Sequence, residues 1–219
     1  MVAPSPYIAI GIAVCALLVS CLTLWLSYFR KGSIRMTKPS VIYLGPDGSR
    51  TGGTIDRPKI FLRALLIADS KRGRVVEHLF ATLTRQETRQ NFNVWVYGDD
   101  NLKRGSGLHV SDVGVVTNHH FLLPADNSEF RFRGGLYHLE LFATLLGDRN
   151  PIKLLSQSIT VTDADGSSLS SHMCGLYFDW GPQGNGYVSH LDRARDGPRA
   201  VSNSPASPSR AVDPGTSPG

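Results

Sequence analysis

Two adjacent carboxylates, Asp99 and Asp100, are the side chains best suited by type and spacing to metal chemistry. They follow the apolar segment Val94–Tyr97 in the stretch "VWVYGDDN". Paired carboxylates can hold divalent metal ions that activate a water or hydroxyl nucleophile and stabilise a transferred phosphoryl group. A nearby histidine would complete a metal-assisted hydrolase site, and the candidates along the chain are His109, His119 and His120.

The same quartet, Tyr97 to Asp100, is similar to the Tyr-Gly-Asp-Asp hairpin of RNA-dependent polymerases. In that class the strand resumes with apolar residues directly after the carboxylates, whereas here the polar stretch "NLKRGSG" follows. A polymerase domain also needs far more chain than this sequence offers. Gly-Asp-Asp-Asn has the composition of a turn, in which Gly and Asn tolerate positive φ and Asp bonds to nearby backbone. We interpret the quartet as the end of a strand.

The histidines and the last cysteine give little sign of catalysis. His119 and His120 are adjacent, so on a strand they point to opposite faces and cannot share an ion without a bulge. The sequence has no His-x-His pair and no His-Glu-x-x-His motif. Cys174 follows His172 by two residues, a spacing that suits a buried structural cysteine better than an activated thiolate. We therefore expect no catalytic residue, no cofactor and no metal; the carboxylate pair with one histidine remains as the alternative.

The N-terminal segment is apolar for long enough to cross a membrane. Residues Tyr7–Phe29 form an uncharged run of 23 residues. As a helix the run is about 35 Å long, which exceeds the hydrocarbon core of about 30 Å. Trp25 and Tyr28 lie near its end, where amphipathic rings prefer the interface. A cleaved signal peptide would begin with basic residues and have a shorter apolar core. The sequence predicts a transmembrane helix over residues 7–29 after a short extracytoplasmic N-terminus, residues 1–6.

A basic juxtamembrane linker, residues 30–39, follows this helix. Its cations are Arg30, Lys31, Arg35 and Lys38. Positive residues are retained on the cytoplasmic side and attract anionic lipid headgroups. We therefore expect the N-terminus outside and the folded domain on the cytoplasmic side of the plasma (cytoplasmic) membrane; a domain outside is the alternative. Only one cysteine lies beyond the helix, which agrees with a reducing compartment.

The overall charge of +5 is modest and comes largely from this linker. A nucleic-acid surface would require a longer basic stripe with interleaved aromatic residues. No such stripe is present, so we do not expect nucleic-acid binding.

From Ser40 to Asp163 the apolar pattern changes to alternation with period two. "EFRFRGG" sets Phe130 and Phe132 against two arginines, while "IFLRALLIA" is apolar almost throughout, as in a strand buried on both faces. In "IFLRALLIA" the one residue that is not apolar is Arg63. Turn sequences such as "GPDGS", "DSKRG" and "PADNS" separate the runs. Short strands with frequent turns indicate an antiparallel sandwich or barrel.

One segment, Val75–Gln86, fits two patterns. Val76, Leu79, Phe80 and Leu83 have the spacing of a helical stripe, while Val and Thr are typical of strands. We favour a strand because the flanking segments are strands, and a helix is the alternative.

The stretches "FRGGLYHLELFATLL" and "KLLSQSITVTD" resemble the last two strands of an immunoglobulin-like sandwich. The resemblance implies that Tyr137 lies at the corner before the penultimate strand, with its hydroxyl bonded back to the corner backbone and the final strand alongside. The two core cysteines of antibody-type domains are absent. The predicted fold is thus mainly β: an antiparallel, immunoglobulin-like sandwich behind a single N-terminal transmembrane helix.

We place the sandwich at residues 40–192, with a C-terminal extension from about 166. The extension, "SHMCGLYFDWGPQGNGYVSHL", is expected to add one or two strands that cover an edge. Residues 193–219 are rich in Pro, Ser and Gly, with almost no large apolar side chain, which predicts a disordered tail.

These patterns favour a single-pass membrane protein that acts as a non-enzymatic binding or scaffolding module. Its partners would be the lipid bilayer, through residues 7–29, and a protein of unknown identity. Alternation in "NFNVWVYG" sets Trp95 and Tyr97 opposite Phe92, Val94 and Val96. We predict that these two aromatic residues form an exposed contact surface, or alternatively that they are packed under the segment Ser170–Leu191.

Overall fold

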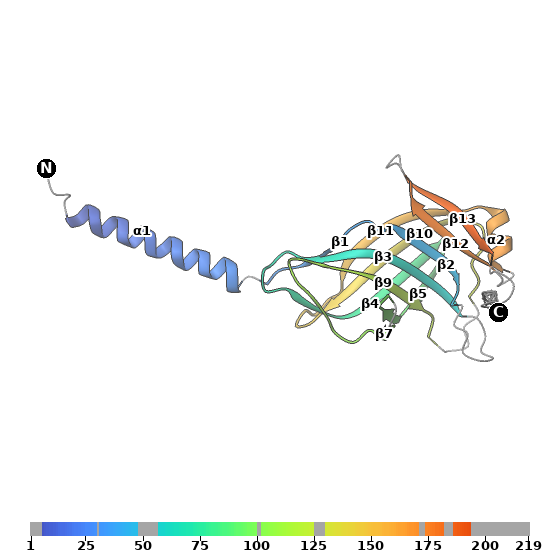
Figure 1. Cartoon of the computed structure of the whole chain (residues 1–219), viewed down its shortest axis with the longest axis horizontal. Helices are drawn as coiled ribbons and strands as arrows, with labels where there is room; N and C mark the ends of the chain where they lie inside the picture. Colours follow the sequence, from blue (N-terminus) through green and yellow to red (C-terminus); the bar gives the residue numbers. More distant parts are fainter. Residues whose placement is uncertain are drawn as a thin grey trace, which may run out of the picture.

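The computed structural model describes residues 6–29, 31–47, 57–99, 102–124, 130–170, 174–181 and 186–193. Helix α1 (Pro6–Leu24) continues into a short π-helix, η1 (Trp25–Phe29), and projects from one end of the β-domain (Figure 1). Neither helix contains a buried residue. Among the described residues, Pro6–Phe29 is the one helical stretch long and apolar enough to cross a membrane. A single apolar helix at the N-terminus is therefore confirmed.

Two antiparallel sheets form most of the rest of the described chain (Figure 1). The strands of sheet 1, in chain order, are β1 (Ile34–Met36), β2 (Val41–Pro46), β3 (Pro58–Ala68), β6 (Val94–Tyr97), β7 (Lys103–Arg104), β9 (Val115–Leu122), β12 (Cys174–Trp180) and β13 (Tyr187–Arg193). They are arranged in the order β13-β12-β2-β3-β9-β6-β7, with β1 paired to β3. Sheet 2 contains β4 (Arg74–Arg85), β5 (Thr88–Phe92), β8 (Leu108–Val110), β10 (Gly135–Leu145) and β11 (Ile152–Val161). Its order is β11-β10-β4-β5, with β8 paired to β4.

One hydrophobic core lies between the two sheets. Alternate residues of β3, including Ile60, Leu62 and Leu66, are buried, and alternate residues of β10, including Leu139 and Leu141, face them from sheet 2. The residues between them on β3 are only half-buried. The expectation that "IFLRALLIA" is buried on both faces is therefore wrong for its outer face.

Strand β4 settles the ambiguity of Val75–Gln86 in favour of a strand. Its register against β10 shifts beyond Thr144, so that Leu145 lies opposite Val76 while Thr144 lies opposite His78. The bulge inserts one extra residue into β4, so the buried residues Val76 and Leu79 are three positions apart. Beyond Leu79 the buried apolar residues return to period two. A spacing of three that looks helical in the sequence is produced here by a β-bulge.

Tyr137 lies at the corner before the long hairpin, as the resemblance to sandwich domains implied. Its hydroxyl donates to the carbonyl oxygen of Arg133 and accepts from the N–H of the same residue, both at 2.8 Å. Strand β11 pairs antiparallel with β10 directly alongside. The backward hydrogen bond and the pairing of the last two strands of this segment are confirmed.

Two local features differ from the expectations. Residues Ile34–Met36, expected within a linker, form β1 and pair with β3, because Ile34 buries its side chain in the core. A helix, α2 (Asp163–Ser170), follows β11. Thr162 caps its N-terminus: Thr162 Oγ1 accepts from the N–H of Asp165 and donates to the Asp165 carboxylate.

The C-terminal extension adds the hairpin β12–β13, which widens sheet 1 beyond β2. This agrees with the expectation that it covers an edge. The tail expected at residues 193–219 lies, except for Arg193 at the end of β13, outside the described residues.

Candidate functional site

Trp95 and Tyr97 do not form the exposed face that the sequence suggested. Trp95 is 1% exposed, and Tyr97 packs partly buried against the core, with its ring stacked on Trp95 at 5.0 Å between centroids. The chain leaves sheet 2 at Phe92 and enters sheet 1 at Val94, and Asn93 between them resets the alternation. Phe92 and Trp95 therefore both point inward, although they are three residues apart.

The three candidate histidines are not brought together. His119 is fully buried and lies on the inner face of β9, where its Nδ1 accepts from Trp95 Nε1 at 3.3 Å. His120 lies on the outer face against the Phe61 ring, and His109 is in β8 of the other sheet. The described residues include no group of three His, Cys, Asp or Glu side chains arranged to hold a metal ion.

Asp99 and Cys174 take structural positions. Asp99 forms an exposed ion pair with Arg63 at 3.1 Å, and Asp100 lies outside the described residues. Cys174 is buried at the start of β12. His172, its neighbour in the sequence, also lies outside the described residues.

The basic cluster predicted after the helix is dispersed in space, because β1 carries its residues along sheet 1. Lys31 lines a cavity at the end of the domain that adjoins η1. Arg35 pairs with Asp69 at 3.1 Å, and Lys38 Nζ lies 4.6 Å from the centre of the Trp180 ring. Arg30 lies outside the described residues.

The outer face of sheet 1 carries an aromatic row that the sequence did not reveal. Five ring-bearing residues lie directly opposite one another on five neighbouring strands: His190 on β13, Tyr177 on β12, Tyr43 on β2, Phe61 on β3 and His120 on β9. Ring centroids are 5.4 Å apart for His190 and Tyr177, 4.8 Å for Tyr43 and Tyr177, and 4.9 Å for Phe61 and His120. We call these five residues the aromatic row.

Small residues and a cation hold the middle of the aromatic row in place. A Cβ atom at Gly45 or Gly175 would overlap the Tyr43 ring, so glycine at both positions allows that ring to lie close to the backbone. The Tyr43 hydroxyl donates to the Pro46 carbonyl at 3.0 Å. Lys59 Nζ lies 5.7 Å from the centre of the same ring and also pairs with Asp47 at 3.1 Å.

Four of the five rings, those of Tyr43, Tyr177, Phe61 and His120, are uncharged at neutral pH. Burial and the neighbouring Lys59 lower the pKa of His120 to about 4. Burial raises the pKa values of Tyr43 and Tyr177 above their usual range, and the nearby Asp192 carboxylate adds to both shifts. Neutral, half-buried rings can stack on aromatic or flat apolar groups and offer a few hydroxyl and imidazole hydrogen bonds. They supply neither an activated nucleophile nor a metal site.

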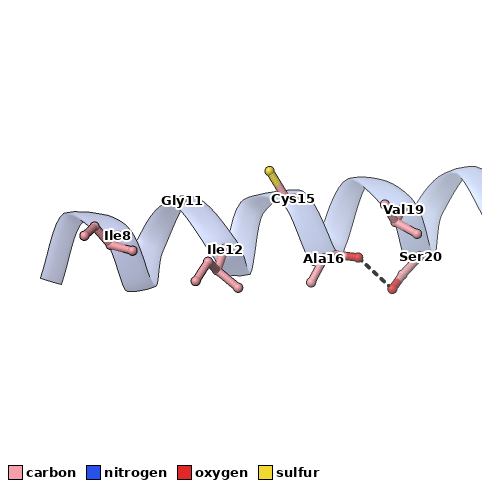
Figure 2. A pocket seen from close by; sticks show the side chains of 7 residues that line it. All are labelled: Ile8, Gly11, Ile12, Cys15, Ala16, Val19 and Ser20. Carbon is pink, nitrogen blue, oxygen red and sulfur yellow. Dashed lines mark hydrogen bonds between the residues drawn. The ribbon is translucent and has the colours of Figure 1, made fainter. Parts of the chain in front are cut away.

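A shallow apolar groove runs along α1 (Figure 2). Small residues line part of it, among them Gly11, Cys15 and Ala16, and the Ser20 hydroxyl donates to the Ala16 carbonyl at 2.8 Å. Small side chains at this spacing allow close approach of another helix within a membrane.

No family model and no curated protein matches the sequence. Among solved structures, the CooA pilin subunit from enterotoxigenic Escherichia coli is similar over 56% of this chain and 99% of its own, with 12% sequence identity and a TM-score of 0.27. No argument rests on a similarity at this level.

Proposed function

We propose that the chain is a single-pass membrane protein whose β-domain, an immunoglobulin-like sandwich, binds a protein partner and catalyses no reaction. The observation that carries the binding role is the aromatic row on the outer face of sheet 1. Half-buried aromatic side chains, held rigidly by their neighbours, supply contact area at low cost in conformational entropy.

The row replaces Trp95 and Tyr97 as the proposed contact surface, because Trp95 is buried. Its exposure increases toward one edge, where the His190 side chain is 56% exposed and faces the 53% exposed Asp179 carboxylate at 3.2 Å. Contacts would therefore begin at β13 and β12 and extend across Tyr43 toward Phe61.

Membrane anchoring is supported by helix α1 with η1, which is apolar, 24 residues long and free of buried positions. The proposed orientation places the domain on the cytoplasmic side of the plasma membrane, since all the cations near the helix follow it. Cys174 is 6% exposed and is a poor reporter of sidedness. Leu136→Cys would place a thiol at a site that is 63% exposed. A membrane-impermeant thiol reagent should label this variant only after the cells are permeabilised.

The binding role is tested by photo-crosslinking in the native membrane. A photoreactive amino acid replaces Tyr177 in the full chain, and the matched control carries it at Leu136, on the outer face of sheet 2. A discrete protein adduct at Tyr177 that is absent at Leu136 supports the proposal. Equal adducts at both sites, or none at either, would count against the aromatic row as the contact surface.

A second comparison separates the domain from its anchor. A form that begins at Lys31 keeps β1 and removes α1 and η1. Retention of the adduct in this form would locate partner binding in the β-domain. Loss of the adduct would indicate that the helix or the membrane is required.

A further inference from the structure

A cavity of about 320 Å³ lies at the end of the β-domain that adjoins the helix. Its walls come from separate parts of the chain: Lys31 and Gly32 after the helix, Ser70, Arg72 and Gly73 in the β3–β4 turn, Arg74 and Val75 at the start of β4, His109 in β8, and Leu146 after β10. Lys31 follows Phe29, the last residue of η1, by two positions, a span of at most about 7 Å. If the helix spans a bilayer, the cavity lies at the membrane surface.

The charge of the cavity favours an anion. None of the described residues that line it is Asp or Glu, whereas Lys31, Arg72 and Arg74 are cations. Arg74 is already engaged: it donates to the carbonyl of Gly32 at 2.9 Å and pairs with Asp148 at 2.7 Å. Lys31 and Arg72 are exposed and form no ion pair with any described residue, so both remain available to a ligand.

Ser70 provides a second and independent indication of a ligand. Its Oγ atom is buried and has no hydrogen-bond partner among the described residues. The hydroxyl lies against Gly32, where an added Cβ would overlap it. Buried hydroxyls in folded proteins nearly always have a partner. The hydroxyl is closed to solvent where it stands, so the Ser70 side chain would rotate about its Cα–Cβ bond to donate to an oxygen atom of an anion in the cavity.

Apolar side chains at the same end suit a membrane surface better than bulk water. Val113 is 85% exposed and Leu146 is 58% exposed. Val113 lies at the same end because Ser111, two residues before it, is bonded to the end of β3. The carbonyl of Ser111 accepts from the N–H of Ala68, the last residue of that strand. Exposed apolar tips beside cations are typical of surfaces that enter the headgroup region of a bilayer.

We propose that this cavity binds the phosphate of an anionic phospholipid headgroup in the leaflet from which the helix emerges. Lys31 and Arg72 contact the phosphate oxygens and Ser70 Oγ donates to one of them. Val113 and Leu146 rest in the apolar part of the interface. The inference rests on the membrane anchoring proposed above, but on neither the orientation of the domain nor its protein partner.

The test uses the full chain in lipid nanodiscs, either of phosphatidylcholine alone or with about one fifth phosphatidylserine. Backbone hydrogen exchange is measured over residues 69–74, 111–114 and 146–150. We expect exchange to be slower by about fivefold in the anionic discs, the factor that one cation contributes at an anionic surface. Lys31→Gln with Arg72→Gln should abolish the difference. Arg131→Gln with Arg133→Gln removes the same charge from two exposed sites near Tyr137, at the opposite end of β10, and should preserve it.

The other outcomes discriminate between explanations. Equal exchange in both kinds of disc, with the chain incorporated, would overturn the headgroup site and leave the anchoring intact. Failure of the chain to incorporate would overturn both. If inorganic phosphate added to neutral discs slows exchange as strongly as phosphatidylserine does, the cavity is a site for a free anion and the assignment to a lipid is wrong.

Discussion

Trp95 Nε1 donates a hydrogen bond to His119 Nδ1 at 3.3 Å in the core between the two sheets. The indole nitrogen is a donor only, so Nδ1 carries a lone pair and the imidazole proton lies on Nε2. Nε2 is buried and has no hydrogen-bond partner among the described residues. Protonation of the ring would place two donors against each other in a buried site. The pair therefore requires a neutral histidine.

This pair predicts a loss of stability in mild acid. Burial, with a smaller contribution from His120, lowers the pKa of His119 from 6.5 to about 4. Between these values the unfolded chain binds a proton that the folded chain does not, so the free energy of unfolding falls as the pH drops from 6.5 to 4 and levels off below. The full shift corresponds to about 3 kcal/mol as an upper limit. Urea unfolding of the detergent-solubilised chain between pH 7 and pH 4 would measure it.

Matched variants assign the pH effect to this imidazole. His119→Asn retains an acceptor for Trp95 but cannot be protonated, so its stability should depend less on pH than that of the unsubstituted chain. His138→Asn, which removes a histidine whose side chain is 45% exposed, is the control. Identical pH profiles for the unsubstituted chain and His119→Asn would show that the effect arises elsewhere.

Gly105 packs against the Trp95 ring, and this contact predicts a steric penalty. Its N–H donates to the Trp95 carbonyl at 2.9 Å, and an added Cβ would overlap the indole. Gly105→Ala should lower the free energy of unfolding by about 1–3 kcal/mol, as overpacking of a rigid core does. Gly186→Ala is the control, because a Cβ there meets no atom within 4 Å and the change should stay within about 0.5 kcal/mol. Similar unfolding midpoints for the two variants would contradict the close approach.

Arg74 is predicted to matter more for stability than Arg35, although both pair with an aspartate at the same end of the domain. The Arg74 side chain is 11% exposed and bonds to Asp148 and to the Gly32 carbonyl, whereas the Arg35 side chain is 76% exposed. Arg74→Gln should cost about 1–3 kcal/mol, less than for a fully buried pair because Asp148 is 29% exposed. Arg35→Gln should cost about 0–1 kcal/mol. Denaturant unfolding of both variants gives the comparison, and an equal cost would argue against a special role for Arg74.

Local pattern predicted much of the fold, because period two and turn residues act within a few positions of one another. The apolar helix and strands β10 and β11 follow from such short-range signals, while the backward hydrogen bond of Tyr137 and the pairing of these strands follow from the resemblance to sandwich domains. The same reasoning placed the Trp95 side chain on the exposed face, whereas it is buried, because the crossing between sheets at Asn93 depends on tertiary packing. It also overlooked α2, although Thr162 and Asp165 carry the capping-box spacing.

The aromatic row and the cavity beside the helix depend on strand order, which local pattern does not contain. Tyr43 and Tyr177 are neighbours because β12 pairs with β2, across more than half the chain. Lys31, Ser70 and Arg72 line one cavity because β1 begins at Ile34 directly opposite Ala68, where β3 ends. In both cases the residue types are ordinary, and only their placement makes them candidates for binding.

The hydroxyl of Tyr137 should contribute to stability independently of the ring that carries it. Tyr137 is 2% exposed, and its hydroxyl is bonded to both the N–H and the carbonyl of Arg133. Tyr137→Phe keeps the packing of the ring and leaves those backbone groups without the hydroxyl, which should cost about 1–3 kcal/mol. Tyr97→Phe is the matched control, because the Tyr97 hydroxyl forms no hydrogen bond with the described residues, and it should change stability by about 0.5 kcal/mol or less. Thermal and urea unfolding of both variants would decide, and a neutral Tyr137→Phe would mean that solvent satisfies the Arg133 backbone as well as the hydroxyl does.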